Sequence, residues 1–224
     1  MSKNWNDFKL DNGKTVGFMR GDNLEWWTKK GVRSERPIDR APYYNKFFKN
    51  IKKVNKNFDF KNYQNKVVGE VCGGPFGGII EAYLPLEQKY QIDIFASDFE
   101  KLNWINSPID KTTWIESPCE EITLSDDHLD VLFGFNSIDH GWDYKSALKE
   151  CIRVSKECYI SFDTNRYKSP HYPDLNHYQI VDYNDVVEFV ESMKNENLQI
   201  HYWHWDHAIP GGKVKVFELW AKKI

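Results

Sequence analysis

The sequence has no apolar run approaching the ~18 residues of a membrane-spanning helix, and its first residues lack the apolar core of a signal peptide. It has only four cysteines, Cys72, Cys119, Cys151 and Cys158, and no C-x-x-C pair. Without a secretory signal this count favours free thiols. Thirty basic and 33 acidic residues give a formal net charge of −3, so no overall field attracts nucleic acid. These absences predict a soluble, cytoplasmic protein that binds neither membranes nor nucleic acids.

Aromatic residues, in contrast, are abundant, with 9 Trp, 12 Tyr and 14 Phe among 224 residues. Several lie before residue 60, in the stretches 25–28 (EWWT) and 42–48 (PYYNKFF). The second stretch continues with apolar residues near helical spacing and predicts a helix over 42–56, and 56–66 is expected to be a linker. The length suits one domain with an appendage. We therefore expect an N-terminal helical cap over 1–60 and a main domain over 61–224.

Strand and helix patterns alternate after residue 60. The predicted strands of this region are 66–71, 92–96, 114–115, 129–135 and 157–163. The predicted helices are 78–84, 99–105, 143–155 and 186–193. Such alternation indicates an α/β fold with a Rossmann-like, mostly parallel sheet and helices on both faces. Two final strand-like runs, 199–205 and 214–221, flank Pro210-Gly211-Gly212 and predict a C-terminal antiparallel hairpin.

A glycine-rich segment, 70–78 (EVCGGPFGG), directly follows the first strand of this alternation. Ligands of open α/β sheets bind at the carboxyl ends of the strands, where glycines let the backbone approach them, although ordinary turns also use such clusters. No Lys or Arg lies between Val67 and Lys89, and no Lys-Ser or Lys-Thr pair follows the glycines, which excludes a triphosphate-binding loop. The G-x-G-x-x-G spacing of dinucleotide-binding loops is also missing.

Two carboxylates indicate which ligand this loop would hold. Glu70 stands immediately before the glycines, where it would repel a pyrophosphate and attract a cation. S-adenosylmethionine carries a sulfonium and an ammonium, and so fits. Asp98 is expected to end the second strand, where a carboxylate accepts hydrogen bonds from both ribose hydroxyls. A dinucleotide or a solvated turn would also suit Asp98, so the choice of ligand depends on Glu70.

Four segments in this order resemble the successive motifs of class I S-adenosylmethionine-dependent methyltransferases. They begin at Glu70 (EVCGGPFG), Ser97 (SDFEKL), Asp130 (DVLFGFNSIDHGWD) and Leu148 (LKECIRVSK), and the resemblance covers about residues 64–165. It implies S-adenosyl-L-methionine as the cofactor. The cofactor-binding residues that we expect are Glu70, Cys72, Gly73, Gly74, Gly77, Asp98, Phe99, Pro118, Cys119 and Asn136.

The resemblance also implies individual roles. Glu70, Gly74 and Gly77 would line the methionine end of the cofactor, Asp98 the ribose and Asn136 the sulfonium side. Two departures from the family pattern are visible: Cys72 and Phe76 replace glycines, and Pro118 stands where many members have an acidic residue beside the adenine. The backbone of Cys119, with Ser117 or Glu120 nearby, would then have to recognise the adenine.

The segment 136–140 (NSIDH) leaves the end of the 129–135 strand and faces the same crevice. Histidine titrates close to neutral pH, as a general base should. His140, oriented by Asp139 or another carboxylate, is therefore the candidate that takes a proton from an acceptor hydroxyl. Capping of the next helix or packing in the loop is the alternative. His171, His177 and Asp163 follow the fifth strand, but their spacing matches no standard metal site, and we expect no metal.

The cap supplies candidate acceptor-binding residues. Aromatic rings exclude water and stack on flat or sugar-like ligands, whereas plain packing against the sheet is the other interpretation. The residues assigned to the acceptor are Trp26, Trp27, Tyr43, Tyr44 and His177. In the final hairpin, strand alternation places His201, Trp203, Trp205 and His207 on one face and His204 on the other, which favours half-buried aromatics over a histidine cluster.

The expected function is that of an S-adenosylmethionine-dependent methyltransferase acting on oxygen of a small molecule or of a sugar or glycan precursor. The sequence has no Asn-Pro-Pro-Tyr-like tetrapeptide, the family's cue for amino methylation of nucleic-acid bases. Two other classes stay open. Glu70 and the irregular glycine spacing count against a nicotinamide-dependent reductase, and Glu70 with Asp98 counts against a non-catalytic binding subunit of the same fold.

Overall fold

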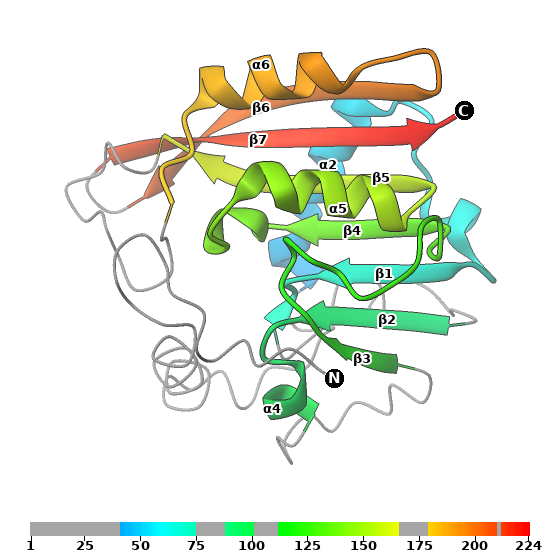
Figure 1. Cartoon of the computed structure of the whole chain (residues 1–224). Coiled ribbons are helices and arrows are strands. Elements are labelled where there is room, and N and C mark those ends of the chain that lie inside the picture. Colours follow the sequence, from blue (N-terminus) through cyan, green and yellow to red (C-terminus); the bar gives the residue numbers. More distant parts are fainter. Residues whose placement is uncertain (1–40, 75–87, 101–111, 166–178, 210–211) are drawn as a thin grey trace.

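The structure is a computed structural model that describes residues 41–74, 88–100, 112–165, 179–209 and 212–224 (Figure 1). Most of the predicted cap and the predicted helix 78–84 lie outside these ranges. The division of the chain at residue 60 therefore stays a prediction. Among the described residues, no helix has the length and apolar character needed to cross a bilayer.

A seven-stranded sheet in the order β3-β2-β1-β4-β5-β7-β6 forms the centre of the molecule. Its strands are β1 (Val67–Val71), β2 (Gln88–Asp93), β3 (Thr112–Glu116), β4 (Val131–Phe135), β5 (Glu157–Thr164), β6 (Leu198–Ile209) and β7 (Gly212–Lys223). The first five strands pair in parallel, and β7 runs antiparallel to both of its neighbours, β5 and β6. The predicted mostly parallel sheet and C-terminal hairpin are confirmed.

The strand order reverses at β1, which lies between β2 and β4. The carboxyl ends of the five parallel strands therefore meet at one edge of the sheet, on the left in Figure 1. In open α/β sheets the ligand crevice forms outside this edge, at the point of reversal. β7 is inserted between β5 and β6, so the antiparallel strand is an interior strand and β6 is the edge strand.

The second strand ends earlier than its sequence pattern predicts. The expected strand over 92–96 is in fact β2, which ends at Asp93, and α4 (Ala96–Glu100) begins three residues later. The Asp93 side chain accepts a hydrogen bond from the backbone N–H of Phe95 at 2.9 Å. An aspartate that binds the backbone two residues ahead closes a turn, and this turn explains why the apolar residues 94–96 do not extend the strand.

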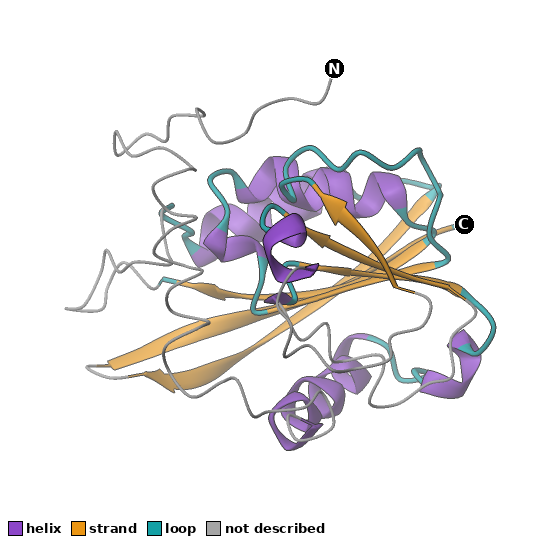
Figure 2. Cartoon of the chain, turned by 90° about the horizontal axis from the view of Figure 1, so that it is seen from below, coloured by secondary structure: helices purple, strands orange, loops and turns teal. Residues whose placement is uncertain are grey.

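Helices cover both faces of the sheet, as predicted (Figure 2). On one face lie α5 (Tyr144–Val154) and α6 (Tyr183–Met193), and on the other lies α2 (Ala41–Val54). Asp143 and Asp182 cap α5 and α6 by accepting backbone N–H bonds. The predicted apolar stripe of α5 is completely buried and consists of Ala147, Leu148, Cys151 and Val154.

The α2 face has an aromatic core. Phe47 and Phe48 of α2 pack against Phe135 of β4, with ring centroids 5.3 and 5.9 Å apart. The segment 56–66, expected to be a linker, contributes to this core because it contains the short helix η4 (Phe60–Tyr63). Phe58 and Tyr63 are buried there. Apolar side chains so close to a sheet face gain more from packing than from an extended linker conformation.

The final hairpin alternates as predicted. Trp203 and Trp205 of β6 face the α2 side and join its aromatic core. His204 faces the opposite side, where its Nδ1 lies 2.9 Å from the hydroxyl of Tyr183 in α6. Residues two apart in a strand share a face, and this rule alone separates the two sets.

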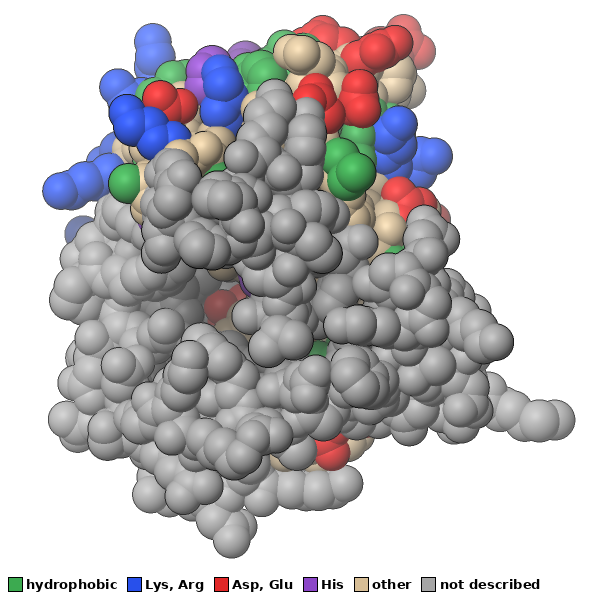
Figure 3. Space-filling view, turned by 90° about the vertical axis from the view of Figure 1, so that its left-hand side faces the viewer, with side chains coloured by type: hydrophobic (Ala, Val, Ile, Leu, Met, Phe, Trp, Pro, Cys, Tyr) green, Lys and Arg blue, Asp and Glu red, His purple; other side chains and the backbone are tan. Residues whose placement is uncertain are grey.

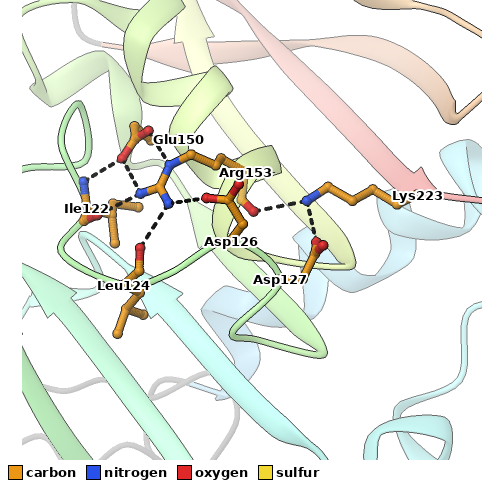
Figure 4. Close-up of polar contacts among 7 residues, drawn as sticks. All are labelled: Ile122, Leu124, Asp126, Asp127, Glu150, Arg153 and Lys223. Atoms are coloured by element: carbon orange, nitrogen blue, oxygen red, sulfur yellow. Dashed lines mark hydrogen bonds and ion pairs between the residues drawn. The ribbon is translucent and has the colours of Figure 1, made fainter.

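An arginine links the loop before β4 to α5 (Figure 4). The Arg153 guanidinium donates to both carboxylate oxygens of Glu150, to Asp126 and to the carbonyls of Ile122 and Leu124, all at 2.7–2.9 Å. Beside it, Lys223 of β7 donates to the Arg153 carbonyl at 2.9 Å and pairs with Asp127. This cluster holds the loop 122–128, and therefore the start of β4, against the last strand.

Candidate functional site

The backbone turns sharply at the ends of β1 and β4, beside the point of strand-order reversal. Cys72 and Asn136 follow these strands, and both have a φ of 53°, while Gly74 has a φ of 66°. Such left-handed conformations are unusual for residues other than glycine and gather at ligand-binding sites. Cys72 thus has a backbone conformation typical of glycine, the residue that the resembled motif has at this position. Among the described side chains that are visible from this edge are acidic ones (Figure 3).

Beneath the glycine loop lies a buried polar layer from β1 and β2. Glu70 Oε2 is 3.5 Å from Lys89 Nζ, and both side chains are at most 2% exposed. Gly73 lies directly on this layer, because a Cβ atom there would be 2.6 Å from Glu70 Oε1 and 2.6 Å from Gln91 Nε2. Glu70 is therefore paired with a buried lysine, which the sequence pattern did not predict. Within the described part of the chain, the fully buried Gln91 amide has no hydrogen-bond partner.

Three further carboxylates give the edge a negative charge. The Cys119 thiol lowers the pKa of Cys72 through a hydrogen bond, but burial and the charges of Asp93, Glu120 and Asp139 outweigh it and raise that pKa. The Cys72 thiol therefore stays protonated, with three carboxylates near it. Asp93 and Asp139 are 7% and 2% exposed. An acidic edge of this kind favours a cationic ligand.

The loop after β3 is fastened to the loop after β4. Glu120 Oε1 accepts backbone N–H bonds from Trp142 at 2.7 Å and Asp143 at 3.2 Å. Gly141 allows this approach, since a Cβ atom there would be 2.2 Å from the same oxygen. Cys119 Sγ donates to Glu120 Oε2 at 3.3 Å. The loop that contains the buried Pro118 and Cys119 is thereby held against the segment that follows β4.

Replacing Glu120 by Gln should change how stability depends on pH. Burial raises the pKa of Glu120 above its ordinary value of 4.5, although the two N–H bonds oppose this shift. The unfolded chain therefore loses the proton first, and wild-type stability falls as pH rises from about 4.5 to the folded-state pKa. Glu120→Gln keeps an acceptor oxygen and does not titrate. We expect its free energy of unfolding, relative to wild type, to rise across this window in urea denaturation.

The exposed neighbour Glu121 supplies the control for Glu120→Gln. Glu121→Gln removes one carboxylate charge from the same loop without touching the Trp142 and Asp143 N–H groups. A stability difference between wild type and Glu120→Gln that is the same at pH 4 and pH 8 would contradict the prediction.

The candidate base lies in the short helix η6 (Ile138–His140) directly after β4. Asn136 Nδ2 is 3.3 Å from His140 Nε2, so the amide donates to the ring in the tautomer that carries its hydrogen on Nδ1. Ile138 is fully buried and anchors the turn. The structure thus brings Asn136 and His140 together at the crevice, and the half-buried ring is oriented at least in part by an amide.

Asp98 and Phe99 lie in α4, beyond the turn that ends β2. Phe99 is 1% exposed and packs on Phe95, with ring centroids 6.2 Å apart. The carboxylate at the strand end is Asp93, which the sequence interpretation missed because the apolar run continues to Ala96. The register between β1 and β2 identifies Asp93 as the residue at the strand end. The N–H of Cys72, just after β1, donates to the carbonyl of Ile92, the residue before Asp93, at 2.8 Å.

The overall arrangement resembles solved methyltransferase structures. No family model and no curated protein matches the sequence. A candidate sarcosine dimethylglycine methyltransferase from Galdieria sulphuraria superposes with a TM-score of 0.61 at 11% identity over 92% of this chain and 98% of that protein. The magnesium protoporphyrin IX methyltransferase of Synechocystis with bound S-adenosylmethionine gives a TM-score of 0.54 at 9% identity, over 90% and 96% of the two chains. The chain has the methyltransferase fold.

A third similar structure is a candidate methyltransferase in complex with the Trm112 methyltransferase activator of Haloferax volcanii, with a TM-score of 0.60 at 8% identity over 90% of this chain and 98% of that one. Identities this low establish the fold alone.

Most of the predicted cofactor residues that the structure describes lie on or near the loops that follow β1, β2, β3 and β4. Phe99 is the exception. The other predicted site residues lie partly outside the described ranges. Trp26, Trp27, Gly77 and His177 are in undescribed segments. Tyr43 and Tyr44 belong to α2, but their side chains are outside the description. Their roles stay predictions.

Proposed function

We propose that the chain is an S-adenosylmethionine-dependent methyltransferase that methylates oxygen on a small molecule or on a sugar or glycan precursor. One observation carries the proposal: the glycine-like turn at Cys72 lies among Asp93, Glu120 and Asp139, on the crevice edge of a methyltransferase fold. A cation suits this edge, and a dinucleotide pyrophosphate does not. The same charges count against a nicotinamide-dependent reductase.

The residues present fit the cofactor. The backbone of Cys72, Gly73 and Gly74 would hold its methionine end, and the unpartnered Gln91 amide beneath the loop supplies donors and acceptors there. We propose Asp93 for the ribose because it stands at the end of β2, although the sequence motif favours Asp98. The Pro118–Cys119 backbone would meet the adenine. When bound, the cofactor supplies a methyl group activated by a sulfonium.

Asn136 and His140 would act on the acceptor. His140 would take the proton of the acceptor hydroxyl on Nε2, the ring nitrogen that carries no hydrogen, when the hydroxyl takes the place of the Asn136 amide that positions the ring through the Nδ2–Nε2 contact. A general base in a crevice gains from such positioning because the reacting atoms must be aligned at about 3 Å. The undescribed aromatic residues of the cap, Trp26 and Trp27, are proposed to exclude water from the acceptor.

Titration calorimetry with S-adenosylhomocysteine tests the proposal. Wild type should bind, and Asp93→Asn should weaken binding by about tenfold, because one pair of charge-assisted hydrogen bonds is worth about 1.5–3 kcal/mol. Asp98→Asn is the matched control and should change binding less than threefold. A larger loss of affinity in Asp98→Asn than in Asp93→Asn would assign ribose binding to Asp98. The absence of S-adenosylhomocysteine binding at millimolar concentration would contradict the methyltransferase hypothesis.

His140→Ala separates the chemistry from cofactor binding. We expect its affinity for S-adenosylhomocysteine to stay within threefold of wild type, while formation of S-adenosylhomocysteine with a panel of sugar and phenol acceptors is lost. An equal loss of both would assign His140 to the cofactor pocket. Cofactor binding with no turnover in wild type would favour the non-catalytic binding subunit.

A further inference from the structure

A second polar cluster lies at the carboxyl edge of the sheet, on the α2 face. Asp163 near the end of β5 is 2% exposed, and its Oδ1 lies 4.0 Å from Nδ1 of His207 in β6. Beside this pair, Trp205 Nε1 donates to Oε1 of Glu218 at 2.8 Å, and Glu218 is also 2% exposed. The proposed methyl-transfer chemistry at His140 does not use any of these four residues.

The inserted strand β7 explains why His207 reaches Asp163. Asp163 pairs with Val216 of β7, and Val216 pairs with Trp205 of β6, so these three side chains share one face and one level. β5 and β6 are therefore two strand spacings apart, about 9.6 Å. The His207 and Asp163 side chains come within 4.0 Å of each other above β7, where their register partners are Val214 and Val216.

An aromatic wall connects this cluster to the proposed methyl-transfer site. The rings of Trp205 and His207 are 5.6 Å apart, and those of Phe47 and Trp205 are 6.5 Å apart. Phe47 in turn lies 5.3 Å from Phe135, the last residue of β4, directly before Asn136. The wall therefore runs from the end of β4, where the methyl group would be transferred, to His207.

The geometry points to an acceptor-binding subsite formed by His207, Asp163 and the Trp205 face, which takes a neutral ring that carries a hydroxyl group. Asp163 orients His207, whose ring is one-third exposed and can hydrogen-bond the hydroxyl. The partly buried Trp205, backed by the core residue Phe47, supplies the flat surface on which a ring stacks. Two buried carboxylates beside the cluster disfavour an acceptor that carries a carboxylate or phosphate. This inference rests on the proposed methyltransferase function and narrows its acceptor class.

The charged groups near His207 come from four elements. Asp163 belongs to β5 and Glu218 to β7, while the exposed Asp206 precedes His207 on the other face of β6. On α2, the Lys53 ammonium lies over the ring of Trp203, 5.8 Å from the ring centroid. Trp203 precedes His207 by four residues in β6. Asp163 is the group in direct reach of the His207 ring, so its removal should change that ring most.

Imidazole NMR of the full chain labelled on histidine tests the subsite without cofactor. The His207 signal is assigned by its loss in His207→Gln. In Asp163→Asn we expect the midpoint of the His207 titration to fall by about 1 pH unit, because an opposite charge is removed. His201, on the same strand and face but beside Trp220 at the other end, is the control whose titration should not change.

Three probes then distinguish the acceptor classes: catechol as a phenol, methyl α-glucopyranoside as a sugar, and benzoate as an anion. Catechol or the glucoside should shift the His207 signal and not that of His201, and benzoate should shift neither. Asp163→Asn should weaken the binding of the hydroxyl probe that shifts the His207 signal by about fivefold, which is the effect of losing one hydrogen bond of about 1 kcal/mol. The probe that binds identifies the source of the hydroxylated ring.

Absence of a His207 shift with either hydroxyl probe overturns the inference, as does an equal shift of His201 or stronger binding of benzoate. S-adenosylhomocysteine calorimetry on Asp163→Asn separates this result from the proposed function. If S-adenosylhomocysteine binding is unchanged and the His207 signal does not shift with either hydroxyl probe, the subsite is disproved but the methyltransferase hypothesis is not. Unchanged His201 and His204 signals show that each variant is folded.

Discussion

Gly73→Ala is expected to weaken S-adenosylhomocysteine binding by about 10- to 100-fold, which corresponds to the 1–3 kcal/mol of an overpacked interior. The new methyl group would be 2.6 Å from Gln91 Nε2, 2.6 Å from Glu70 Oε1 and 2.8 Å from Glu70 Cδ. Neither side chain can withdraw into solvent because both are buried, and Glu70 is also paired with Lys89. The glycine loop must therefore move outward, into the space that the methionine end of the cofactor would occupy.

Gly69→Ala is the matched control for this prediction. Gly69 lies in β1, the strand that leads into the glycine loop, and a Cβ atom there would be 2.5 Å from Leu129 Cδ1 and 2.9 Å from Leu132 Cδ1. It should destabilise the fold without moving the loop, so its affinity should stay within threefold of wild type once the folded fraction is measured. Gly73→Ala combined with Gln91→Ala should recover part of the lost affinity. Wild-type binding by Gly73→Ala alone would show that the loop does not hold the cofactor.

Glu157→Ala should lower the free energy of unfolding by about 3–4 kcal/mol, because it removes several hydrogen bonds to one carboxylate. Glu157 Oε1 accepts from Tyr159 at 2.7 Å, from Trp220 Nε1 at 2.6 Å and from Tyr63 at 3.2 Å. The two tyrosine hydroxyls also lie 2.8 Å apart, and Asn55 donates to Tyr159 at 2.7 Å. Burial raises the pKa of both phenols, so they stay protonated donors. Loss of the Glu157 carboxylate leaves the buried O–H groups of Tyr63 and Tyr159 without this acceptor.

Urea denaturation measures this effect, and Glu157→Gln is the control that retains an acceptor oxygen. We expect Glu157→Gln to lose about 1 kcal/mol, the difference between a charged and a neutral acceptor. Because the network lies at the amino end of β5, far along the strand from the crevice edge, neither variant should alter S-adenosylhomocysteine affinity. Equal stability of the Ala and Gln variants would show that the network contributes little.

Local sequence patterns predicted most of the sheet. The apolar runs that became β1, β4 and β5, and the stripe of Ala147, Leu148, Cys151 and Val154 in α5, follow directly from side-chain periodicity. Periodicity failed where a local polar contact decided the conformation. Asp93 ends β2 by binding the Phe95 N–H, within a run that is otherwise apolar. The residues 56–66 are mostly polar, and only contact with the sheet buries Phe58 and Tyr63.

The candidate site was predicted where it depends on strand order alone. Glu70, Asn136 and His140 each follow or end a parallel strand, and such positions converge by topology. Partners across strands were not predictable. Lys89 is 19 positions from Glu70 and meets it only through the β1–β2 register. The insertion of β7 between β5 and β6 brings His207 and Asp163 together, and no pattern along the sequence predicts that insertion.

The insertion of β7 also determines when the sheet can be completed. β5 has its neighbour β4 as soon as it is synthesised, but its other edge must wait for β7, and β6, which is made earlier, has β7 as its strand neighbour. A nascent chain therefore carries an unpaired, apolar β5 edge through the synthesis of α6 and β6. Unpaired edges of this kind recruit other strands. The same hairpin that brings His207 to Asp163 thus leaves the β5 edge open to other strands until β7 pairs with it.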